Sequence, residues 1–241
     1  MDIEGRVALV TGGAVRVGRV LALGLARAGA NVVIHYNTSE DAAREAVREI
    51  EALGRRAVSV RLDLAGDDVG PAIRTAQDAF GRLDILVNSA STFERAPVPD
   101  ITPAAWDRVL AINLRAPFLL ARAASPLLRT AGGAIVNIAD LSALQPWPSF
   151  AHHSVSKAGL VQLTRVLARA LAPHVRVNAI APGTVLPPTG FHGEDYAGGS
   201  DRRTVAREGR PEDVLDALLF LVRSDFITGE LIVVDGGRML L

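Results

Sequence analysis

The sequence of 241 residues contains no cysteine, so it can form neither a disulfide bond nor a cysteine-ligated metal site. It also lacks an excess of one charge. The 26 basic residues balance 26 acidic ones, which leaves no electrostatic basis for binding nucleic acid or an anionic membrane. No apolar run is long enough to cross a bilayer, and no signal peptide precedes the first apolar segment. We therefore expect a cytoplasmic protein that acts on a small molecule, without a metal, nucleic-acid or membrane partner.

Lysine and tyrosine are almost absent as well. All but one of the 26 basic residues are arginine, and the exception is Lys157. An ammonium is a compact point charge with three rotatable donors, whereas a guanidinium is a planar fork. The single lysine therefore marks a position at which arginine would not serve. The two tyrosines are Tyr36 and Tyr196.

Short apolar runs alternate with helical patterns along the whole chain. We expect seven strands, at residues 7–10, 31–35, 57–62, 84–87, 134–138, 175–179 and 231–234. Apolar strands separated by helices are typical of a parallel sheet that is covered on both faces. The pattern predicts one α/β domain over residues 1–241, a doubly wound Rossmann fold with a seven-stranded parallel sheet and helices on both faces. A long helix is expected at 104–128, and a substrate-binding loop at 183–201.

A glycine-rich turn follows the first predicted strand, in the order Thr11-Gly12-Gly-Ala-Val-Arg16-Val-Gly18. Such a turn between a strand and a helix lets the backbone approach a pyrophosphate, and the helix N-terminus then supplies N–H donors. An NAD-binding unit places an acidic residue after the second strand to bind the ribose hydroxyls. This chain instead has His35-Tyr36-Asn37-Thr38-Ser39 there, whose hydroxyl and imidazole donors suit a 2′-phosphate. An alternative is that His35 and Tyr36 only pack at the end of the strand.

These motifs resemble the nucleotide-binding signature of the short-chain dehydrogenase/reductases. The arginine at position 16 is similar to that of the pteridine reductases, in which it lies near cofactor phosphate and the substrate. The resemblance covers nearly the whole chain and includes Asn88-Ser-Ala-Ser91 and Asn178-Ala-Ile-Ala-Pro182-Gly183. It implies NADPH (NADP) as cofactor and a homotetramer. The residues expected to bind the cofactor are Gly12, Arg16, Val17, Gly18, His35, Tyr36, Asn37, Thr38, Ser39, Asp63, Leu64, Asn88, Ala90, Lys157, Pro182, Gly183 and Val185.

The resemblance also implies a catalytic group of Asn113, Asp140, His153 and Lys157. Most of the superfamily has serine where this chain has Asp140, and the pteridine reductases have aspartate there. The family's catalytic tyrosine precedes the lysine by four residues, and this chain has His153 at that position. An imidazole titrates near neutrality and could donate a proton, with Asp140 favouring its charged form. It is roughly 2 Å shorter than a phenol, a gap that a water molecule, ordered by Asn113, could bridge.

The substrate site predicted by the same resemblance includes an aromatic side chain. Phe93 falls where pteridine reductases stack a phenylalanine on the pterin ring. The full set of predicted substrate residues is Arg16, Ser91, Phe93, Asp140, Leu186 and Tyr196.

Three functions remain open at this point. The first is NADPH-dependent reduction of a pterin-like C=N bond or of a C=O bond. The second is reduction of a 3-oxoacyl thioester, as on acyl-carrier protein, or of carbonyl compounds in general. The third is a catalytically impaired protein that binds NADPH, because His153 replaces the tyrosine.

Overall fold

The computed structural model describes residues 1–186 and 204–241. Its centre is a single seven-stranded sheet in which every neighbouring pair of strands is parallel, in the order β3-β2-β1-β4-β5-β6-β7. The strands are β1 Val7–Thr11, β2 Asn31–Tyr36, β3 Ala57–Arg61, β4 Ile85–Asn88, β5 Ala134–Ile138, β6 Arg176–Pro182 and β7 Leu231–Val234. This order is that of a Rossmann fold, so the predicted fold class is confirmed.

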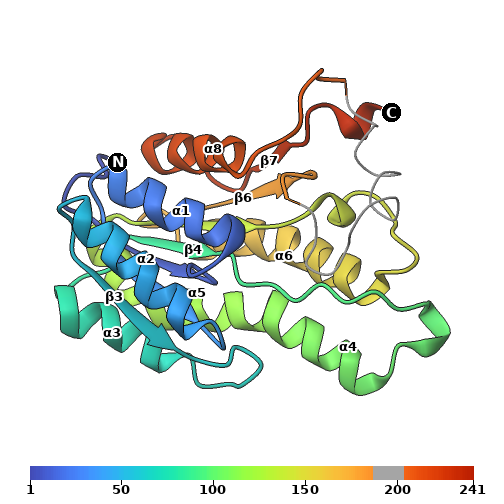
Figure 1. Cartoon of the computed structure of the whole chain (residues 1–241), viewed down its shortest axis with the longest axis horizontal. Coiled ribbons are helices and arrows are strands. Elements are labelled where there is room, and N and C mark those ends of the chain that lie inside the picture. The colour runs from blue at the N-terminus through green and yellow to red at the C-terminus, as the bar shows by residue number, and fades with distance from the viewer. Residues whose placement is uncertain (187–203) are drawn as a thin grey trace.

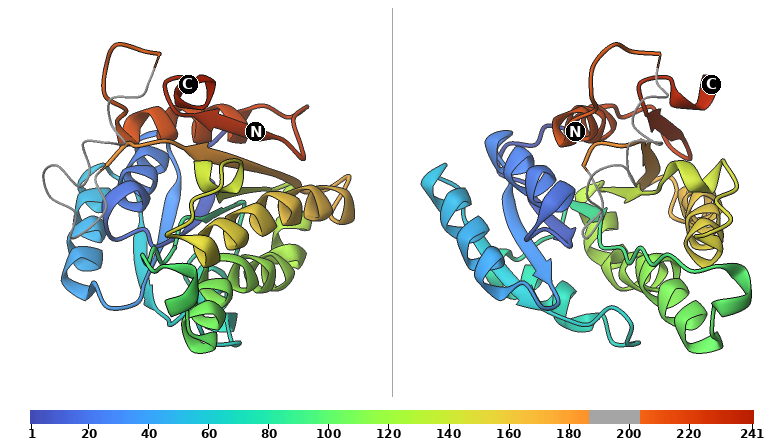
Figure 2. Two further views of the ribbon diagram at one scale, coloured as in Figure 1. Left: turned by 90° about the vertical axis from the view of Figure 1, so that its right-hand side faces the viewer. Right: turned by 45° about the vertical axis from the view of Figure 1, so that its right-hand side comes forward.

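Helices cover both faces of the sheet (Figure 1). The long helices are α1 Arg16–Arg27, α2 Glu40–Ala52, α3 Gly70–Phe80, α4 Pro103–Leu110, α5 Ala116–Ala131, α6 Ala151–Ala170 and α8 Pro211–Arg223. Helices α1, α2 and α8 share one apolar core with the sheet, and α3, α5 and α6 share the other. Figure 2 shows the sheet between these two layers. Both faces are therefore buried, which explains why β1, β4 and β5 are buried along their whole length and are mainly apolar.

The long helix expected at 104–128 is divided into three parts. Helix α4 continues into a π-helical turn, η2, at Ala111–Arg115, and α5 follows without a break in the chain direction. One turn with wider hydrogen bonding rotates the residues around it, and such turns are frequent at functional sites. Apolar periodicity cannot reveal this turn, because the helical pattern continues through it.

The fold brings chemistry-bearing residues to one edge of the sheet. The chain runs outward from β1 to β3 on one side and from β4 to β7 on the other, so β1 and β4 are neighbours with divergent connections. A crevice forms beyond the carboxyl ends of the strands at such a switch point, and ligands of doubly wound sheets bind there. Two short 3₁₀ turns at this edge complete it, η3 Leu141–Ala143 after β5 and η4 Arg238–Leu240 after β7. A further 3₁₀ turn, η1 Val98–Asp100, precedes α4.

Candidate active site

The turn between β1 and α1 has no room for side chains at two of its glycines. A Cβ on Gly18 would lie 2.1 Å from the carbonyl oxygen of Gly12. Gly12 has a φ of +64°, and a Cβ there would meet the backbone of Ala90 at 3.1 Å. Val15 precedes α1 and supplies no side-chain cap to its first turn. The turn therefore exposes backbone N–H groups at a helix N-terminus, which is the geometry that accepts a phosphate.

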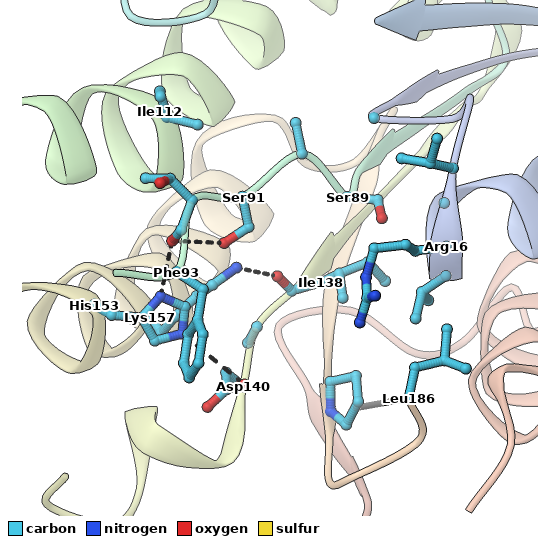
Figure 3. Close-up of a pocket in the computed structure, with 18 of the residues that line it drawn as sticks. Arg16, Ser89, Ser91, Phe93, Ile112, Ile138, Asp140, His153, Lys157 and Leu186 are labelled. Atoms are coloured by element: carbon cyan, nitrogen blue, oxygen red, sulfur yellow. Dashed lines mark hydrogen bonds and ion pairs between the residues drawn. The ribbon is translucent and has the colours of Figure 1, made fainter. Parts of the chain in front are cut away.

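Arg16 opens α1 in a backbone conformation that arginine rarely adopts. Its φ is +54°, the only positive value among the non-glycine residues described. This conformation carries a cost of order 1 kcal/mol or more and persists only where the surroundings hold it. Its side chain lines the crevice, on the other side from His153 and Lys157 in Figure 3. The predicted dual position of Arg16, beside the phosphate turn and the crevice, agrees with this placement.

His35 anchors the glycine turn to β2. Its Nδ1 accepts a hydrogen bond of 3.1 Å from the Gly12 N–H, and its Nε2 donates one of 2.9 Å to the Leu62 carbonyl. Burial lowers the pKa of this imidazole, so the neutral form is favoured. Both nitrogens are engaged, and His35 therefore has no donor left for a 2′-phosphate. The expectation of an imidazole donor was wrong, and the alternative of packing at the strand end describes His35.

The remaining cofactor residues lie around one large cavity of about 920 Å³ at the switch point. The segment 36–39 after β2 and Asp63 after β3 lie along it, as do Lys157 and the turn 182–185 after β6. No acidic side chain stands within the segment 36–39, where an NAD-type site has one. The predicted cofactor residues in its lining are Gly12, Arg16, Val17, Gly18, His35, Tyr36, Asn37, Thr38, Ser39, Asp63, Leu64, Ala90, Lys157, Pro182, Gly183 and Val185.

Asn88 is the one predicted cofactor residue that does not line this cavity. Its side chain is buried and donates a 2.8 Å hydrogen bond to Asn137 on β5. Asn137 in turn donates to Thr164 on α6 at 2.9 Å. The side chain of Asn88 thus links β4 to the neighbouring strand and helix. The sequence motif located the right turn but could not show which way this amide points.

Lys157 is buried on α6 and faces the end of β5. Its Nζ donates a 2.8 Å hydrogen bond to the carbonyl of Ile138 (Figure 3). Burial lowers the pKa of the ammonium to about 8, although the charge of Asp140 acts in the opposite direction. The group is therefore a cation at neutral pH that titrates close to the physiological range. An ammonium with two further donors at the wall of the cavity suits the hydroxyls of a ribose.

His153 and Asp140 face each other at the same wall. The Nε2 atom of His153 lies 3.9 Å from Oδ2 of Asp140 and has no hydrogen-bond partner among the described residues. Its Nδ1 lies 3.1 Å from the carbonyl of Thr92, which requires the proton on Nδ1. Nε2 is consequently the nitrogen that faces Asp140 without a hydrogen of its own in the neutral ring. Figure 3 shows the two side chains beside Lys157, as the sequence predicted.

The Asp140 carboxylate remains ionised at neutral pH. Burial acts to raise its pKa, but the facing His153 imidazole and the Ser142 N–H, which donates at 2.7 Å, more than offset this and leave the pKa below its ordinary value. The side chain is one quarter exposed, whereas that of His153 is almost fully buried. Asp140 therefore places a negative charge beside His153 at the solvent-accessible side of the pair.

Asn113 lies in the π-helical turn and does not line the cavity. Its Nδ2 donates to the Thr92 carbonyl at 3.1 Å and to Ser156 at 3.0 Å, and its Oδ1 accepts from the Thr92 N–H at 2.9 Å. The Nδ1 of His153 lies 3.4 Å from the same amide. Asn113 thus fixes the segment that holds His153, and its amide is not free to order a water molecule in the cavity. That part of the predicted role was wrong.

An aromatic wall, formed by Phe93, Trp147 and Phe150, lies next to His153 and Asp140. Phe93 stacks on Phe150 with ring centroids 4.3 Å apart and meets Trp147 edge-on at 6.4 Å. The His153 imidazole lies edge-on to Phe93 at 4.8 Å. Of the predicted substrate residues, Phe93, Ser91 and Leu186 line the cavity, whereas Tyr196 lies outside the described residues. Phe150 covers one face of Phe93, so at most the other face can stack on a flat ligand.

Several cavity residues were missed by the sequence analysis. The wall also contains Arg108, Ile112, Trp147, Phe150 and Arg238. Trp147 and Phe150 precede α6 in a segment without periodicity, and Arg238 follows the last strand by four residues. A scan for aromatic and cationic residues just after strand ends would have found them, because parallel strands all end at the same edge. Within the described ranges, no helix is long and apolar enough to cross a membrane, and no cluster of potential metal ligands occurs.

Comparison with known proteins identifies relatives along the full length of the chain. The family described as enoyl-(acyl carrier protein) reductase matches residues 13–238. A 3-oxoacyl-[acyl-carrier-protein] reductase of Synechocystis sp. is 34% identical, with 99% of this chain and 98% of the relative covered. A short-chain dehydrogenase from Burkholderia cenocepacia, solved with NADP, is 34% identical with a TM-score of 0.93, covering 99% of this chain and 100% of that one. FolM alternative dihydrofolate reductase 1 from Brucella canis, also complexed with NADP, is 36% identical with a TM-score of 0.91, covering 100% and 97%.

Proposed function

The chain belongs to the short-chain dehydrogenase/reductase superfamily, and we propose that it uses NADPH to reduce a C=N bond of a dihydropterin-like substrate. Members of the superfamily are NAD(P)-dependent oxidoreductases, and related solved structures hold NADP. The choice of substrate rests on one observation: the Asp140–His153 pair lies next to the aromatic wall, because His153 meets Phe93 edge-on. A flat heterocycle with ring nitrogens would stack beside Phe93 and present a nitrogen to the Asp140–His153 pair.

The residues present fit an NADP cofactor. The glycine turn has no space for side chains, so its backbone can approach a pyrophosphate. The segment 36–39 contains no acid and offers the hydroxyls of Tyr36, Thr38 and Ser39. A cation that the sequence did not suggest stands beside it, because Arg61 at the end of β3 donates to the carbonyl of Asn37 at 3.2 Å. Donors and a guanidinium favour a 2′-phosphate over a free hydroxyl.

The proposed chemistry needs one hydride and one proton. NADPH, when bound, supplies the hydride to the carbon of the C=N bond. Lys157 would hold the nicotinamide ribose, since it is a buried cation whose Nζ has donors beyond its bond to Ile138. His153, as imidazolium, would give the proton to the nitrogen, directly or through one water molecule, and Asp140 would stabilise that charge and return a proton from solvent. Asn113 would act as a positioning residue through Thr92.

The second candidate is reduction of a 3-oxoacyl thioester. The observation in its favour is the Synechocystis relative, whose name states that activity. An imine nitrogen is basic enough to take up a proton before hydride transfer, whereas a ketone oxygen is not, and reduction of a ketone therefore relies more on a phenol as proton donor. With His153 in place of tyrosine, we rank this activity second. The third candidate, NADPH binding without turnover, rests on the same replacement. The homotetramer and the cytoplasmic location stay predictions.

A direct comparison of substrates tests the proposal. Purified protein is supplied with NADPH and with either a dihydropterin or an acetoacetyl thioester, and the loss of NADPH absorbance in the near ultraviolet is followed. We expect kcat/KM to be at least about tenfold higher for the dihydropterin, because only this substrate can use the aromatic wall. A higher value for the thioester would move that function to first place. Tight NADPH binding with no oxidation of either mixture would favour the binding protein.

A further inference from the structure

Arg238 brings a guanidinium from the end of the chain to the wall of the cavity. One of its nitrogens donates a 3.0 Å hydrogen bond to Oγ1 of Thr184, and its Cζ lies 5.8 Å from the ring centroid of Trp147. Both partners are uncharged. Within residues 1–186 and 204–241, no carboxylate forms an ion pair with Arg238. A half-buried cation without an anionic partner is the group that a bound anion would neutralise.

The turn that carries Arg238 is held by hydrogen bonds. Asp235 accepts hydrogen bonds from the N–H groups of Gly237 and Met239, both at 2.8 Å, and so closes this turn. Gly237 has a φ of +79°, which allows the chain to reverse there. Gly183 lies against Asp235 so closely that a Cβ would be 2.9 Å from its Cα. The backbone of Arg238 is thus held beside the turn after β6, and the hydrogen bond to Thr184 directs its guanidinium.

Ring contacts lead from Arg238 to the reacting groups. The ring centroid of Trp147 lies 5.8 Å from the guanidinium Cζ and 6.4 Å from that of Phe93, and Phe93 meets His153 edge-on at 4.8 Å. A ring reduced beside His153 would therefore lie along the wall with its far side toward Arg238. Cations exceed acids among the described residues of the cavity lining, and the acids are Asp63 and Asp140. Asp63 follows β3, near the adenine end expected from the resemblance, and Asp140 faces His153. Neither neutralises Arg238.

We propose that Arg238 determines specificity by binding a carboxylate or another anionic group on the tail of the substrate, remote from the ring that is reduced. This inference rests on the proposed function and makes it narrower: among dihydropterins, the enzyme would prefer those with an acidic tail. Another arginine of the lining is Arg108 on α4, which is exposed. It provides the matched comparison.

The test compares two substrates in four proteins. Dihydrofolate carries a glutamate tail and dihydrobiopterin carries an uncharged one, and kcat/KM is measured for both with wild type, R238Q, R238K and R108Q. We expect R238Q to lower kcat/KM for dihydrofolate by about 10- to 100-fold, the range of a charge-assisted hydrogen bond. The value for dihydrobiopterin should change by less than about threefold. R238K should retain part of the selectivity, and R108Q should leave the ratio of the two substrates unchanged.

Other outcomes would overturn the inference. An equal loss for both substrates in R238Q would mean that Arg238 only supports Trp147. A raised Kd for NADPH in R238Q would assign the guanidinium to the cofactor. If only R108Q loses the preference for dihydrofolate over dihydrobiopterin, Arg108 on α4 binds the acidic tail of the substrate. If wild type reduces neither compound, the proposed function fails, and Arg238 is tested by calorimetric binding of folate and biopterin to the NADP-saturated protein. Equal folate affinity in wild type and R238Q would then contradict the inference.

Discussion

The two ends of the cavity are built in different ways. At the cofactor end, the glycine turn and the strand ends present many backbone groups, and His35, one of the side chains that tie them together, is fully engaged by Gly12 and Leu62. At the reacting end, side chains line the wall, and we propose that His153 and Asp140 carry the proton there. The resemblance to the family places a glycine turn at the first end and implies that His153 stands at the tyrosine position of the second. We therefore expect substitutions at the first end to change cofactor binding and those at the second to change turnover.

Gly18→Ala should have the largest effect and should act on the cofactor end alone. The new Cβ would meet the Gly12 carbonyl at 2.1 Å and force the turn open. We expect the Kd for NADPH to rise roughly 100-fold or more, because several charge-assisted hydrogen bonds are lost together. Gly66→Ala is the matched control, since its Cβ would lie 3.4 Å from the nearest atom, the Asp63 carbonyl oxygen. Unchanged affinity in Gly18→Ala would show that the turn does not hold the cofactor.

The Asp140→Asn substitution tests whether the reacting end acts on turnover and not on cofactor binding. The amide cannot stabilise a charged His153, so kcat should fall about 10- to 100-fold while the Kd for NADPH stays the same. Asp107→Asn on the exposed side of α4 is the control and should leave both constants unchanged. A rise in Kd for Asp140→Asn without a fall in kcat would place Asp140 at the cofactor end.

Lys157 lies between the cofactor end and the reacting end of the cavity. Its lowered pKa predicts the direction in which the free energy of unfolding changes with pH. Burial lowers its pKa from 10.5 to about 8, so between these pH values the unfolded chain binds more protons than the folded one. The free energy of unfolding of wild type should therefore rise with pH across this window, relative to Lys157→Met, by on the order of 3 kcal/mol. Urea denaturation of both proteins at the two ends of the window measures it. If the free energies of unfolding of the two proteins change equally with pH, the Lys157 ammonium is not desolvated.

The same variant should weaken NADPH binding at neutral pH. Replacing the ammonium with a thioether removes the donors that Lys157 offers to the ribose, and we expect the Kd to rise about tenfold. For wild type, affinity should fall above pH 8 as the ammonium is lost, and in Lys157→Met this pH dependence should disappear. Retained pH dependence in the variant would assign the titration to another group.

Arg61→Gln should have the smallest effect, confined to the choice between NADPH and NADH. The guanidinium beside Asn37 is exposed, so its contact with a 2′-phosphate is screened by solvent. We expect the preference for NADPH to fall about three- to tenfold with no change in kcat. Arg56 precedes the same strand at its opposite end and donates to the Ala79 carbonyl, so Arg56→Gln is the control. If Arg61→Gln keeps the full preference for NADPH over NADH, the hydroxyl groups of residues 36–39 recognise the 2′-phosphate without Arg61.

Much of the fold could be predicted from the sequence because strand period and apolar content depend on local residues. All seven strands were expected within a few residues of their observed bounds, and the pattern correctly placed helices on both faces. The π-helical turn at Ala111–Arg115 was missed, since the residues on both sides of it keep a helical apolar pattern. Motif positions likewise located Asn88 and Asn113 but not the direction of their side chains, which depends on partners distant in sequence, Asn137 and Thr92.

The reacting end was harder to predict for a related reason. The family resemblance implied that Asp140 and His153 are neighbours, and the structure places the two side chains 3.9 Å apart. The aromatic wall and Arg238 come from segments without a motif, and only the fold brings Trp147 and Arg238 to the same cavity. Residues recruited by tertiary structure alone carry no signal in one sequence beyond their position after a strand.

The central claim is that His153 serves as the proton donor without a tyrosine. The measurement that tests it most directly is NADPH oxidation with a dihydropterin by wild type, His153→Ala and His153→Tyr, together with the Kd for NADPH of each protein. We predict turnover by wild type, a fall in kcat of about 100-fold or more in His153→Ala, and the same Kd in all three proteins. No NADPH oxidation by wild type, together with turnover by His153→Tyr, would contradict this claim. It would identify a reductase fold that binds NADPH without oxidising it.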